Sequence, residues 1–239
     1  MDKTILVTGA SSGIGRAIAI ACAKRGNTVV LTGRNIARLE ETRALMAGEG
    51  HMIIPADLTN EAQRRALAEQ VPALNGVVHC AGIGSRVLCK MLEPDDVQHV
   101  MDANFTAPVL LQTALLQVKK ITAGSSIVFI ASAAASMPSV GNAIYSASKG
   151  ALISYAKCLA LELAPRKIRV NCISPAMVWT DLALVGATEE QLHEAEQAYP
   201  LKRYAQPEDI APMAVYLLSE EALWVTGSNF ELTGGTQTL

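Results

Sequence analysis

Aromatic side chains, net charge and long hydrophobic runs are all scarce in this sequence. Aromatic residues make up 4% of the chain, too few for the stacking platforms that bind single-stranded nucleic acid. The formal net charge of −2 gives no electrostatic attraction to nucleic acid or to an anionic membrane. No apolar run approaches the roughly 18 residues of a membrane-spanning helix, so we expect neither partner.

Cysteine is present, but not in a pairing pattern. The five cysteines stand at positions 22, 80, 89, 158 and 172, an odd number without a Cys-x-x-Cys spacing. This arrangement indicates small, reduced thiols rather than a disulfide framework or a zinc site. The apolar run Thr4–Thr8 is too short for a secretory signal and ends at Gly9. These features predict a cytoplasmic protein without a metal site.

Half of the residues are hydrophobic and 18% are charged, which provides a sizeable core for 239 residues. Short β-rich runs alternate with apolar stripes of helical spacing. We expect strands at residues 4–8, 28–32, 51–55, 76–82, 125–130, 167–173 and 229–232, and helices at 38–47, 95–118, 145–164 and 207–218. The alternation predicts an α/β fold with a single doubly wound parallel sheet, a Rossmann fold with helices on both faces, as one domain over residues 1–239.

A glycine-rich turn follows the first strand. An apolar stripe with helical spacing comes directly after it, so the glycines lie on a strand-to-helix turn. Missing side chains there let backbone N–H groups approach a pyrophosphate at the positive end of a helix. A plain turn is the alternative, but the position after a first strand favours a dinucleotide site. Its candidate residues are Gly9, Ser11, Ser12, Gly13, Ile14 and Gly15.

The second strand ends at Gly33-Arg34-Asn35, where a site for NAD usually carries an acidic residue that binds the adenine ribose. A carboxylate would repel a 2′-phosphate, whereas the guanidinium of Arg34 can pair with one. The sequence therefore predicts that NADP(H) is preferred over NAD(H). The alternative is that Arg34 is a solvated loop charge.

Further candidates follow the ends of other predicted strands. Asp57 could accept a hydrogen bond from an adenine amino group, and it could also cap the helix that starts near Asn60. Later strand ends contribute Ala81, Gly82, Ser132 and Pro175. Ligands of doubly wound sheets bind beyond the carboxyl ends of the strands, so we expect these residues around one cleft.

A Tyr-x-x-x-Lys pair, Tyr145 and Lys149, stands thirteen residues after Ser132. Residues four apart lie on one face of a helix, where a Lys ammonium beside a phenol stabilises the phenolate. Such a phenol can pass a proton near neutral pH, and a hydroxyl such as Ser132 can hold a carbonyl oxygen in place. The alternative is that the pair is ordinary packing and solvated charge.

The stretch from residue 182 to 205 is polar and carries Glu189, Glu190, Glu194 and Glu196. It lies between the sixth strand and the last predicted helix, and we interpret it as a mobile substrate lid. An ordinary solvated helix pair is the alternative.

Over essentially the whole chain these motifs resemble the short-chain dehydrogenase/reductase family. Thr8–Gly15 matches its cofactor loop, and the tetrad Asn104, Ser132, Tyr145 and Lys149 matches in order and spacing. The stretches 169–175, 200–203 and 207–210 match as well. Among subgroups, the chain looks most like the 3-oxoacyl-acyl-carrier-protein reductases.

The resemblance implies an NADP-dependent oxidoreductase that interconverts a small-molecule carbonyl and a secondary alcohol, with a 3-oxoacyl thioester as one candidate substrate. Tyr145 would be the proton donor or acceptor, and Lys149 would lower its proton affinity and bind the nicotinamide ribose. Ser132 would orient the carbonyl, and Asn104 would hold a water that links Lys149 to solvent. Remaining cofactor contacts would come from Asn35, Leu58, Val178 and Thr180, the last at the carboxamide. Family members are mostly tetramers or dimers, so a homo-oligomer is expected.

The chain departs from the family pattern at two points. The usual Asn-Asn-Ala-Gly turn reads His79-Cys80-Ala81-Gly82 here, so the local hydrogen bonding of the strand must differ. His79 and Cys80 do not indicate a metal site or a thiol nucleophile, because adjacent strand residues point to opposite faces of the sheet. The usual glycine after Pro175 is Ala176, which is tolerable unless φ is positive there. A non-catalytic NADP(H)-binding redox sensor or regulator on the same fold remains the rival function.

Overall fold

The computed structural model describes residues 3–185 and 188–236. Seven parallel strands form one sheet in the order β3-β2-β1-β4-β5-β6-β7. The strands are β1 (Thr4–Thr8), β2 (Thr28–Thr32), β3 (Met52–Ile53), β4 (Leu74–His79), β5 (Ile121–Ile130), β6 (Arg169–Pro175) and β7 (Asn229–Leu232). The strand order reverses direction at β1 and β4, so the prediction of a doubly wound parallel sheet is confirmed.

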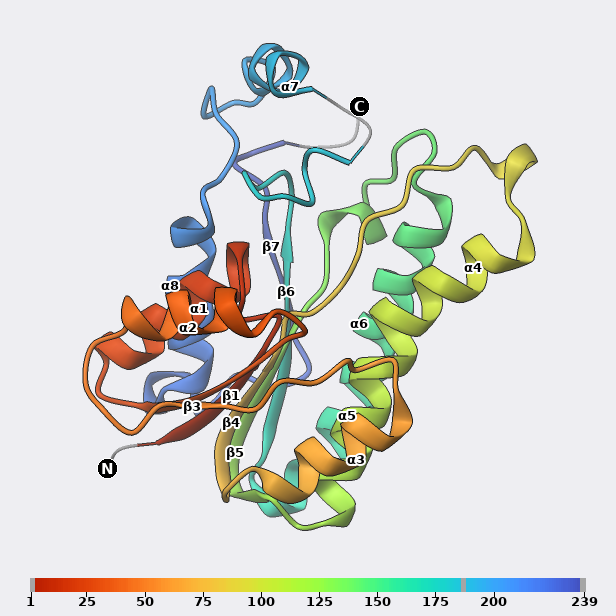
Figure 1. Ribbon diagram of the computed structural model, residues 1–239. Helices are drawn as coiled ribbons and strands as arrows, with labels where there is room; N and C mark the ends of the chain where they lie inside the picture. The colour runs from red at the N-terminus through yellow and green to blue at the C-terminus, as the bar shows by residue number, and fades with distance from the viewer. Residues whose placement is uncertain (1–2, 186–187, 237–239) are drawn as a thin grey trace.

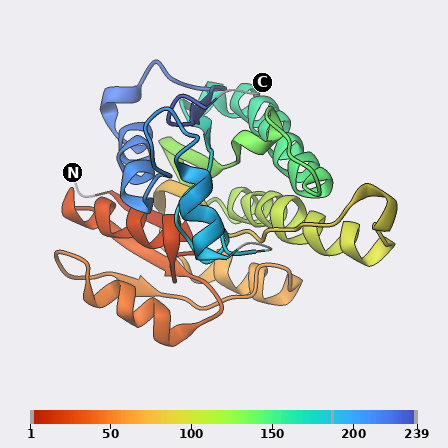
Figure 2. The same cartoon turned by 90° about the horizontal axis from the view of Figure 1, so that it is seen from above.

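Helices cover both faces of the sheet (Figure 1). On one side lie α1 (Gly13–Lys24), α2 (Ile36–Ala44) and α8 (Pro207–Leu218). On the other side lie α3 (Glu61–Gln70), α4 (Pro94–Met101), α5 (Ala107–Gln117) and α6 (Ala143–Leu163). Figure 2 shows the same layers from above, with α7 (Glu189–Glu196) crossing over the sheet.

Two hydrophobic cores follow from the alternation of side chains along each strand. In β1, Leu6 packs into the core under α3, α5 and α6, whereas Ile5 and Val7 pack under α1 and α8. In β5, Ile127 and Phe129 belong to the first core, and the intervening Val128 belongs to the second. The sheet is therefore buried on both faces, which explains why its strands read as nearly continuous apolar runs.

Several element boundaries differ from the sequence prediction. The third strand is only two residues long, although Ile54 N–H and Ala56 N–H still donate to the carbonyls of Leu31 and Gly33. The helix expected over 95–118 is interrupted by a π-helical turn, Asp102–Thr106, between α4 and α5. Asn104 lies in that turn, and wide turns of this kind are frequent at functional sites.

The segment from 182 to 205 contains α7 above the carboxyl-terminal edge of the sheet (Figure 1). Thr188 caps α7, because its hydroxyl accepts from Gln191 N–H while the Gln191 side chain accepts from Thr188 N–H. Residues 186–187 of the predicted lid, and the chain ends of the predicted domain, lie outside the described residues. The mobility of this lid stays a prediction.

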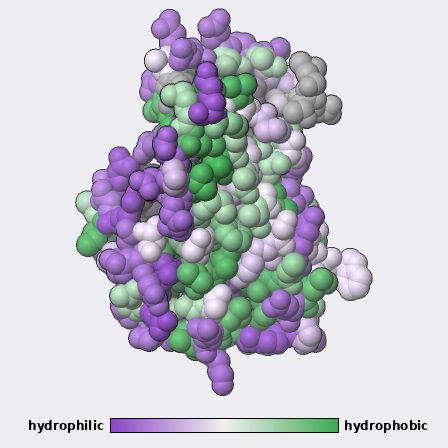
Figure 3. All heavy atoms as spheres, turned by 90° about the vertical axis from the view of Figure 1, so that its right-hand side faces the viewer, coloured by the Kyte–Doolittle hydropathy of each residue, from purple (hydrophilic) through white to green (hydrophobic). Residues whose placement is uncertain are grey.

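Exposed apolar side chains gather over the helical layer of α4, α5 and α6. Val97 on α4, Leu110 on α5 and Leu161 on α6 are exposed, Leu161 to 78%. Figure 3 views this side of the molecule and shows a band of hydrophobic atoms with hydrophilic atoms beside it. Within residues 3–185 and 188–236, no helix is long and apolar enough to cross a membrane.

His79 is a buried histidine at the end of β4. Its ring stacks on Phe129 at 4.6 Å between centroids, and its Nε2 is 3.0 Å from Gln112 Oε1. Burial lowers the pKa of His79 from the usual 6.5 to about 4, and the hydrogen bond to Gln112 offsets only part of that effect. The imidazole is therefore neutral in the folded protein at neutral pH.

This neutral state makes stability depend on pH. Between pH 6.5 and pH 4 the unfolded chain protonates His79 and the folded chain does not, so the free energy of unfolding falls as the pH is lowered through this window, by up to about 3 kcal/mol. We expect His79→Asn to weaken that dependence, because an amide does not titrate. Urea unfolding of both proteins at pH 7 and pH 4.5 measures the difference. An equal fall in the free energy of unfolding for the wild type and for His79→Asn would contradict the prediction.

Candidate active site and cofactor cleft

A cleft of about 770 Å³ runs along the carboxyl ends of the strands. It is lined by every predicted cofactor residue and by three of the four predicted catalytic residues. Those catalytic residues are Ser132, Tyr145 and Lys149, and the cofactor candidates are Gly9, Ser11, Ser12, Gly13, Ile14, Gly15, Arg34, Asn35, Asp57, Leu58, Ala81, Gly82, Pro175, Val178 and Thr180. Asn104 is 1% exposed and lies in contact with the wall rather than on it.

The glycine-rich turn is packed so closely that side chains have no room. Gly9 has φ of +66°, and a Cβ there would come within 2.9 Å of the backbone of Ala81. A Cβ on Gly15, at the start of α1, would overlap the carbonyl oxygen of Gly9. Glycine at both positions therefore allows the turn to pack closely against the chain after β4 and against α1, and the turn lines the cleft at the start of that helix, where a phosphate can approach backbone N–H groups.

The unusual His79-Cys80 pair leaves this arrangement intact. The buried hydroxyl of Thr8 accepts hydrogen bonds from Cys80 N–H at 2.9 Å and Ala81 N–H at 3.0 Å, which ties the end of β4 to β1. Burial raises the pKa of the Cys80 thiol to about 12, so it is not a thiolate nucleophile. Among the described residues no cluster of His, Cys, Asp and Glu could hold a metal ion.

Lys149 is a buried cation at the centre of the cleft. Its side chain is 5% exposed, and its Nζ donates to the carbonyl oxygen of Ile130 at 3.0 Å. The same Nζ lies 5.8 Å from the ring centroid of Tyr145, one turn earlier on α6. Ser132 stands at the end of β5, where its Oγ accepts from Ala134 N–H at 3.1 Å. A hydroxyl, a phenol and an ammonium thus line one side of the cleft.

Asn104 connects the π turn to this group. Its Oδ1 accepts from Ile83 N–H at 2.8 Å, and its Nδ2 donates to the Ile83 carbonyl and to Ser148 Oγ. Ser148 Oγ in turn donates to the carbonyl of Tyr145 at 2.7 Å. Ile83 and Ser148 could not be selected from the sequence, because neither belongs to a recognisable motif.

One end of the cleft is formed by the loops after β2 and β3. Asn35 caps α2, with its Oδ1 accepting from Arg38 N–H, and the exposed Arg34 precedes it. Asp57 does not cap α3, contrary to one predicted role, because Asn60 does so. The carboxylate of Asp57 accepts instead from the side chain and backbone of Thr59, and these bonds hold its pKa below the usual range.

The opposite end is formed by the chain after β6. Ala176 lines the cleft. Its backbone φ is not positive, so alanine is unstrained at this position. Its N–H donates to the carbonyl of Leu232. Thr180 lies against the glycine turn, since a Cβ on Gly13 would come within 3.0 Å of its methyl group.

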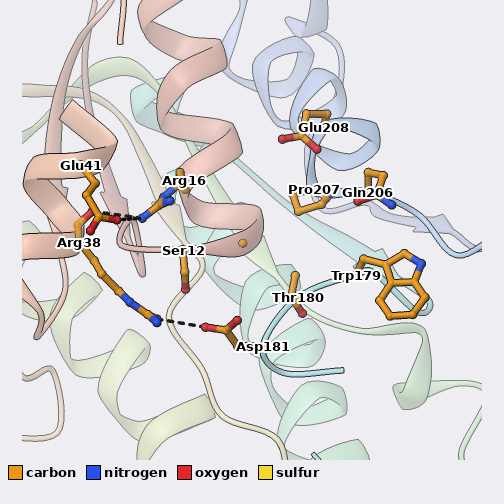
Figure 4. Close-up of a pocket in the computed structure, with 11 residues that line it drawn as sticks. Ser12, Arg16, Arg38, Glu41, Trp179, Thr180, Asp181, Gln206, Pro207 and Glu208 are labelled. Atoms are coloured by element: carbon orange, nitrogen blue, oxygen red, sulfur yellow. Dashed lines mark hydrogen bonds and ion pairs between the residues drawn. The ribbon is translucent and has the colours of Figure 1, made fainter. Parts of the chain in front are cut away.

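A second, polar pocket of about 450 Å³ shares Ser12, Gly13 and Thr180 with the cleft. Figure 4 shows two ion pairs beside it, Arg16 with Glu41 and Arg38 with Asp181. Arg38 and Asp181 were missed by the sequence analysis although both line the cleft. The position of Arg38, one helical turn after Arg34, was the available signal.

The glycine packing gives a direct test of the turn. We expect Gly15→Ala to lower the thermal unfolding temperature and abolish dinucleotide binding, because the new methyl group overlaps the Gly9 carbonyl. Gly150→Ala is the matched control: nothing outside its own helix lies within 4 Å of the added methyl group, and alanine favours helix α6 by up to about 1 kcal/mol. Thermal unfolding and cofactor titration measure both variants, and wild-type behaviour of Gly15→Ala would contradict the assigned geometry.

Comparison with known proteins places the chain in a family. A family model described as enoyl-(acyl carrier protein) reductase matches residues 9–237. The 3-oxoacyl-acyl-carrier-protein reductase FabG of Aquifex aeolicus (strain VF5) is 34% identical over 241 residues, 98% of this chain and 96% of that protein. Carbonyl reductase family member 4 of Danio rerio is 31% identical over 243 residues, 100% of both chains.

The fold comparison covers the same length. A solved structure of an actinorhodin polyketide ketoreductase variant with NADPH has a TM-score of 0.89 and 29% identity, covering 98% of this chain and 97% of that chain. The family match, the relatives and the shared fold each span nearly all of the sequence, including every element that lines the cleft. The chain therefore belongs to the short-chain dehydrogenase/reductase family of oxidoreductases.

Proposed function

We propose that this protein is an NADP(H)-dependent oxidoreductase that interconverts a carbonyl and a secondary alcohol. The observation that carries the proposal is that Ser132, Tyr145 and Lys149 line the same cleft as the glycine-rich Gly9–Gly15 turn. A proton-transfer group and a dinucleotide site are thus parts of one cavity. Either half alone would fit a simple binding protein.

The cleft fits a pyridine dinucleotide. The Gly9–Gly15 turn would hold the pyrophosphate, Asp57 and Leu58 the adenine, and Thr180 the carboxamide, with Ile14, Ala81, Pro175 and Val178 as further walls. When bound, the nicotinamide supplies or accepts the hydride of the reaction. The protein's own part is to bind and orient the reactants and to move the proton.

Proton transfer is assigned to Tyr145. A phenol on the cleft wall can donate to the substrate oxygen as a carbonyl is reduced, and accept from it in the reverse direction. The buried ammonium of Lys149 lies one helical turn from Tyr145 and has donors left for the ribose hydroxyls, since its one hydrogen bond within the described residues goes to the Ile130 carbonyl. Ser132 Oγ is placed to bind the same substrate oxygen from the end of β5.

Asn104 is assigned the proton link from Lys149 to solvent. A Cβ on Gly82 would lie 2.9 Å from Asn104 Oδ1 and 3.4 Å from Lys149 Nζ. The amide oxygen and the ammonium therefore flank Gly82 on the same side, and a water bridging them would complete the proposed link. Glycine at position 82 is thus consistent with a water relay between the amide and the ammonium.

A preference for NADP(H) over NAD(H) rests on the residues after β2. Arg34 is exposed at the cleft, followed by Asn35, and Ser11 lies close by, since its Oγ would be 3.5 Å from a Cβ on Gly33. A guanidinium and two neutral hydrogen-bonding groups suit a 2′-phosphate dianion better than a ribose hydroxyl. The NADPH named for the ketoreductase structure supports the same choice.

The substrate end of the cleft is lined mainly by small and apolar side chains. Its walls include Ala133, Ala134, Met137, Leu182 and Tyr199. Such walls accept a carbonyl with an apolar chain, and the names of relatives include both a carbonyl reductase and 3-oxoacyl-acyl-carrier-protein reductases. We infer a small-molecule carbonyl or alcohol as the substrate, with a 3-oxoacyl thioester as one candidate.

A homo-oligomer, a dimer or tetramer, is part of the proposal. The band of exposed apolar residues over α4, α5 and α6 in Figure 3 would be covered by a second copy. Patches of this kind on a soluble protein usually mark an interaction surface.

The rival function is a non-catalytic NADP(H)-binding sensor or regulator. NADPH oxidation, followed by absorbance against a panel of ketones and 3-oxoacyl thioesters, separates the two functions. Turnover of at least one carbonyl supports the enzyme. Tight NADPH binding without turnover across a wide panel would favour the rival.

The proton-transfer assignment has a specific test. Tyr145→Phe removes the only ionisable atom and leaves the ring, so we expect kcat to fall by about 10²- to 10⁴-fold while NADPH still binds. Tyr155→Phe, on the same helix but half-buried with its ring against Phe105 and Phe129, is the matched control. Steady-state kinetics on an accepted ketone decide the question, and wild-type rates for Tyr145→Phe would exclude this mechanism.

The cofactor preference is tested at Arg34. Arg34→Asp places a carboxylate where a ribose 2′-hydroxyl can donate to it and a 2′-phosphate is repelled. We expect the ratio of kcat/KM for NADPH to that for NADH to fall from above one to below one. Arg65→Asp, an equal charge change on exposed α3, should leave the ratio unchanged. Equal or better efficiency of the wild type with NADH would remove the assignment.

A further inference from the structure

Thr180, the residue assigned to the nicotinamide carboxamide, lies between two side chains that are each held by a distant element. We name residues 179–181 the strap. Figure 4 shows Thr180 and Asp181 near the glycine turn, with Trp179 turned to the other side of the polar pocket. The backbone of the strap makes two hydrogen bonds: Trp179 N–H donates to the carbonyl of Ala205 at 2.8 Å, and the carbonyl of Thr180 accepts from Ala183 N–H at 2.9 Å.

The first side-chain anchor is Glu196, at the end of α7. Its Oε2 accepts from the indole Nε1 of Trp179 at 3.0 Å and from Tyr204 N–H at 3.2 Å. Its Oε1 lies 3.0 Å from Nδ1 of His193, whose ring contacts the Trp179 ring at 4.6 Å between centroids. These bonds to one carboxylate, which is only 13% exposed, join the strap to α7 and to the chain before α8.

The second anchor is Arg38, from the first turn of α2. Its Nη1 lies 3.1 Å from Oδ2 of Asp181, across 143 positions of sequence. Both side chains are well exposed, Arg38 to 51% and Asp181 to 74%. This pair therefore stabilises less than the anchor at Glu196, since exposed ion pairs contribute little.

The two anchors bind the residues on either side of Thr180, Glu196 binding Trp179 and Arg38 binding Asp181. We propose that Glu196 and, more weakly, Arg38 are positioning residues that set the orientation of Thr180 toward the nicotinamide, Glu196 acting through Trp179 and Arg38 through Asp181. The inference rests on the proposed function of the cleft. It assigns a role in hydride-transfer geometry to the 182–205 segment, which the sequence analysis treated only as a substrate lid.

The expected signature is a fall in kcat with little change in cofactor affinity. The adenine and pyrophosphate contacts remain, so NADPH still binds, but a displaced Thr180 leaves the nicotinamide poorly oriented. We expect Glu196→Ala to lower kcat about 10- to 100-fold, as for a lost hydrogen bond to a charged group. Glu196→Gln, which retains an acceptor for the indole, should be intermediate. Glu194→Gln on the exposed face of α7 is the matched control.

The second anchor separates positioning from simple charge attraction. Asp181→Asn frees Arg38 and removes a negative charge beside the cofactor phosphates. If Arg38 acts as an anchor of the strap, kcat falls about 2- to 5-fold, within the range of an exposed ion pair. If Arg38 serves only to attract phosphate, NADPH binds more tightly and kcat does not fall, which would overturn this half of the proposal.

A double-mutant cycle tests whether Glu196 acts through Thr180. If it does, Glu196→Ala should have little further effect on kcat once Thr180→Ala is present. Additive losses would overturn the proposal and leave Glu196 with a structural role alone. Active sites are counted by NADPH titration for each variant, so that partial unfolding is not mistaken for a fall in kcat.

A spectroscopic readout makes the test independent of turnover. The chain has two tryptophans, and Trp224 is 99% exposed, so Trp224→Phe leaves Trp179 as the only indole. In that background we expect Glu196→Ala to shift Trp179 emission to longer wavelength and to change energy transfer to bound NADPH. An unchanged spectrum would contradict the anchor. A wild type that neither binds NADPH nor turns over a carbonyl would instead overturn the proposed function itself.

Discussion

The rest of the site depends on the hydrogen bond that holds the buried ammonium of Lys149 at the carbonyl of Ile130. An unpaired charge inside a protein is costly, so it must be surrounded by fixed acceptors. The carbonyl of Ile130 supplies one at 3.0 Å, and it is available because β5 ends there. The position of the cation is therefore set by where a central strand of the sheet ends. The position of Tyr145, one turn earlier on the same helix, follows from that of Lys149.

The parts that sequence reasoning predicted are those specified by local pattern. The apolar run of β1 and the glycines after it predict a strand followed by a tight turn. The structure has this turn, and at Gly9 and Gly15 it has no space for a side chain. The four-residue spacing of Tyr145 and Lys149 places both side chains on one face of a helix. Alternating strands and helices then bring the strand ends to one edge of the sheet, which is why nearly all predicted residues line one cleft.

The parts that were not predicted depend on contacts between residues far apart in sequence. The π turn at Asn104 widens the helix so that the amide bonds Ile83 and Ser148, and no local propensity signals it. At the His79-Cys80 departure, the end of β4 is bound by Thr8, seventy-two positions from Cys80, through the backbone N–H of that cysteine. Asp57 was a candidate cap of the helix that starts near Asn60, and only the folded turn shows that Asn60 itself is the cap.

The division between sheet and loops also explains why the reaction class is clearer than the substrate. Tyr145, Lys149 and the glycine turn lie on strand ends and helix starts, whose positions are fixed by two buried cores. The proposed substrate walls lie on loops and on the 182–205 segment, outside the sheet. Proteins about one-third identical to this chain accordingly carry names for different carbonyl substrates on one framework. If Glu196 positions Thr180, the 182–205 segment also affects hydride transfer. Substitutions in this segment that alter substrate binding must then keep the carboxylate of Glu196 beside Trp179.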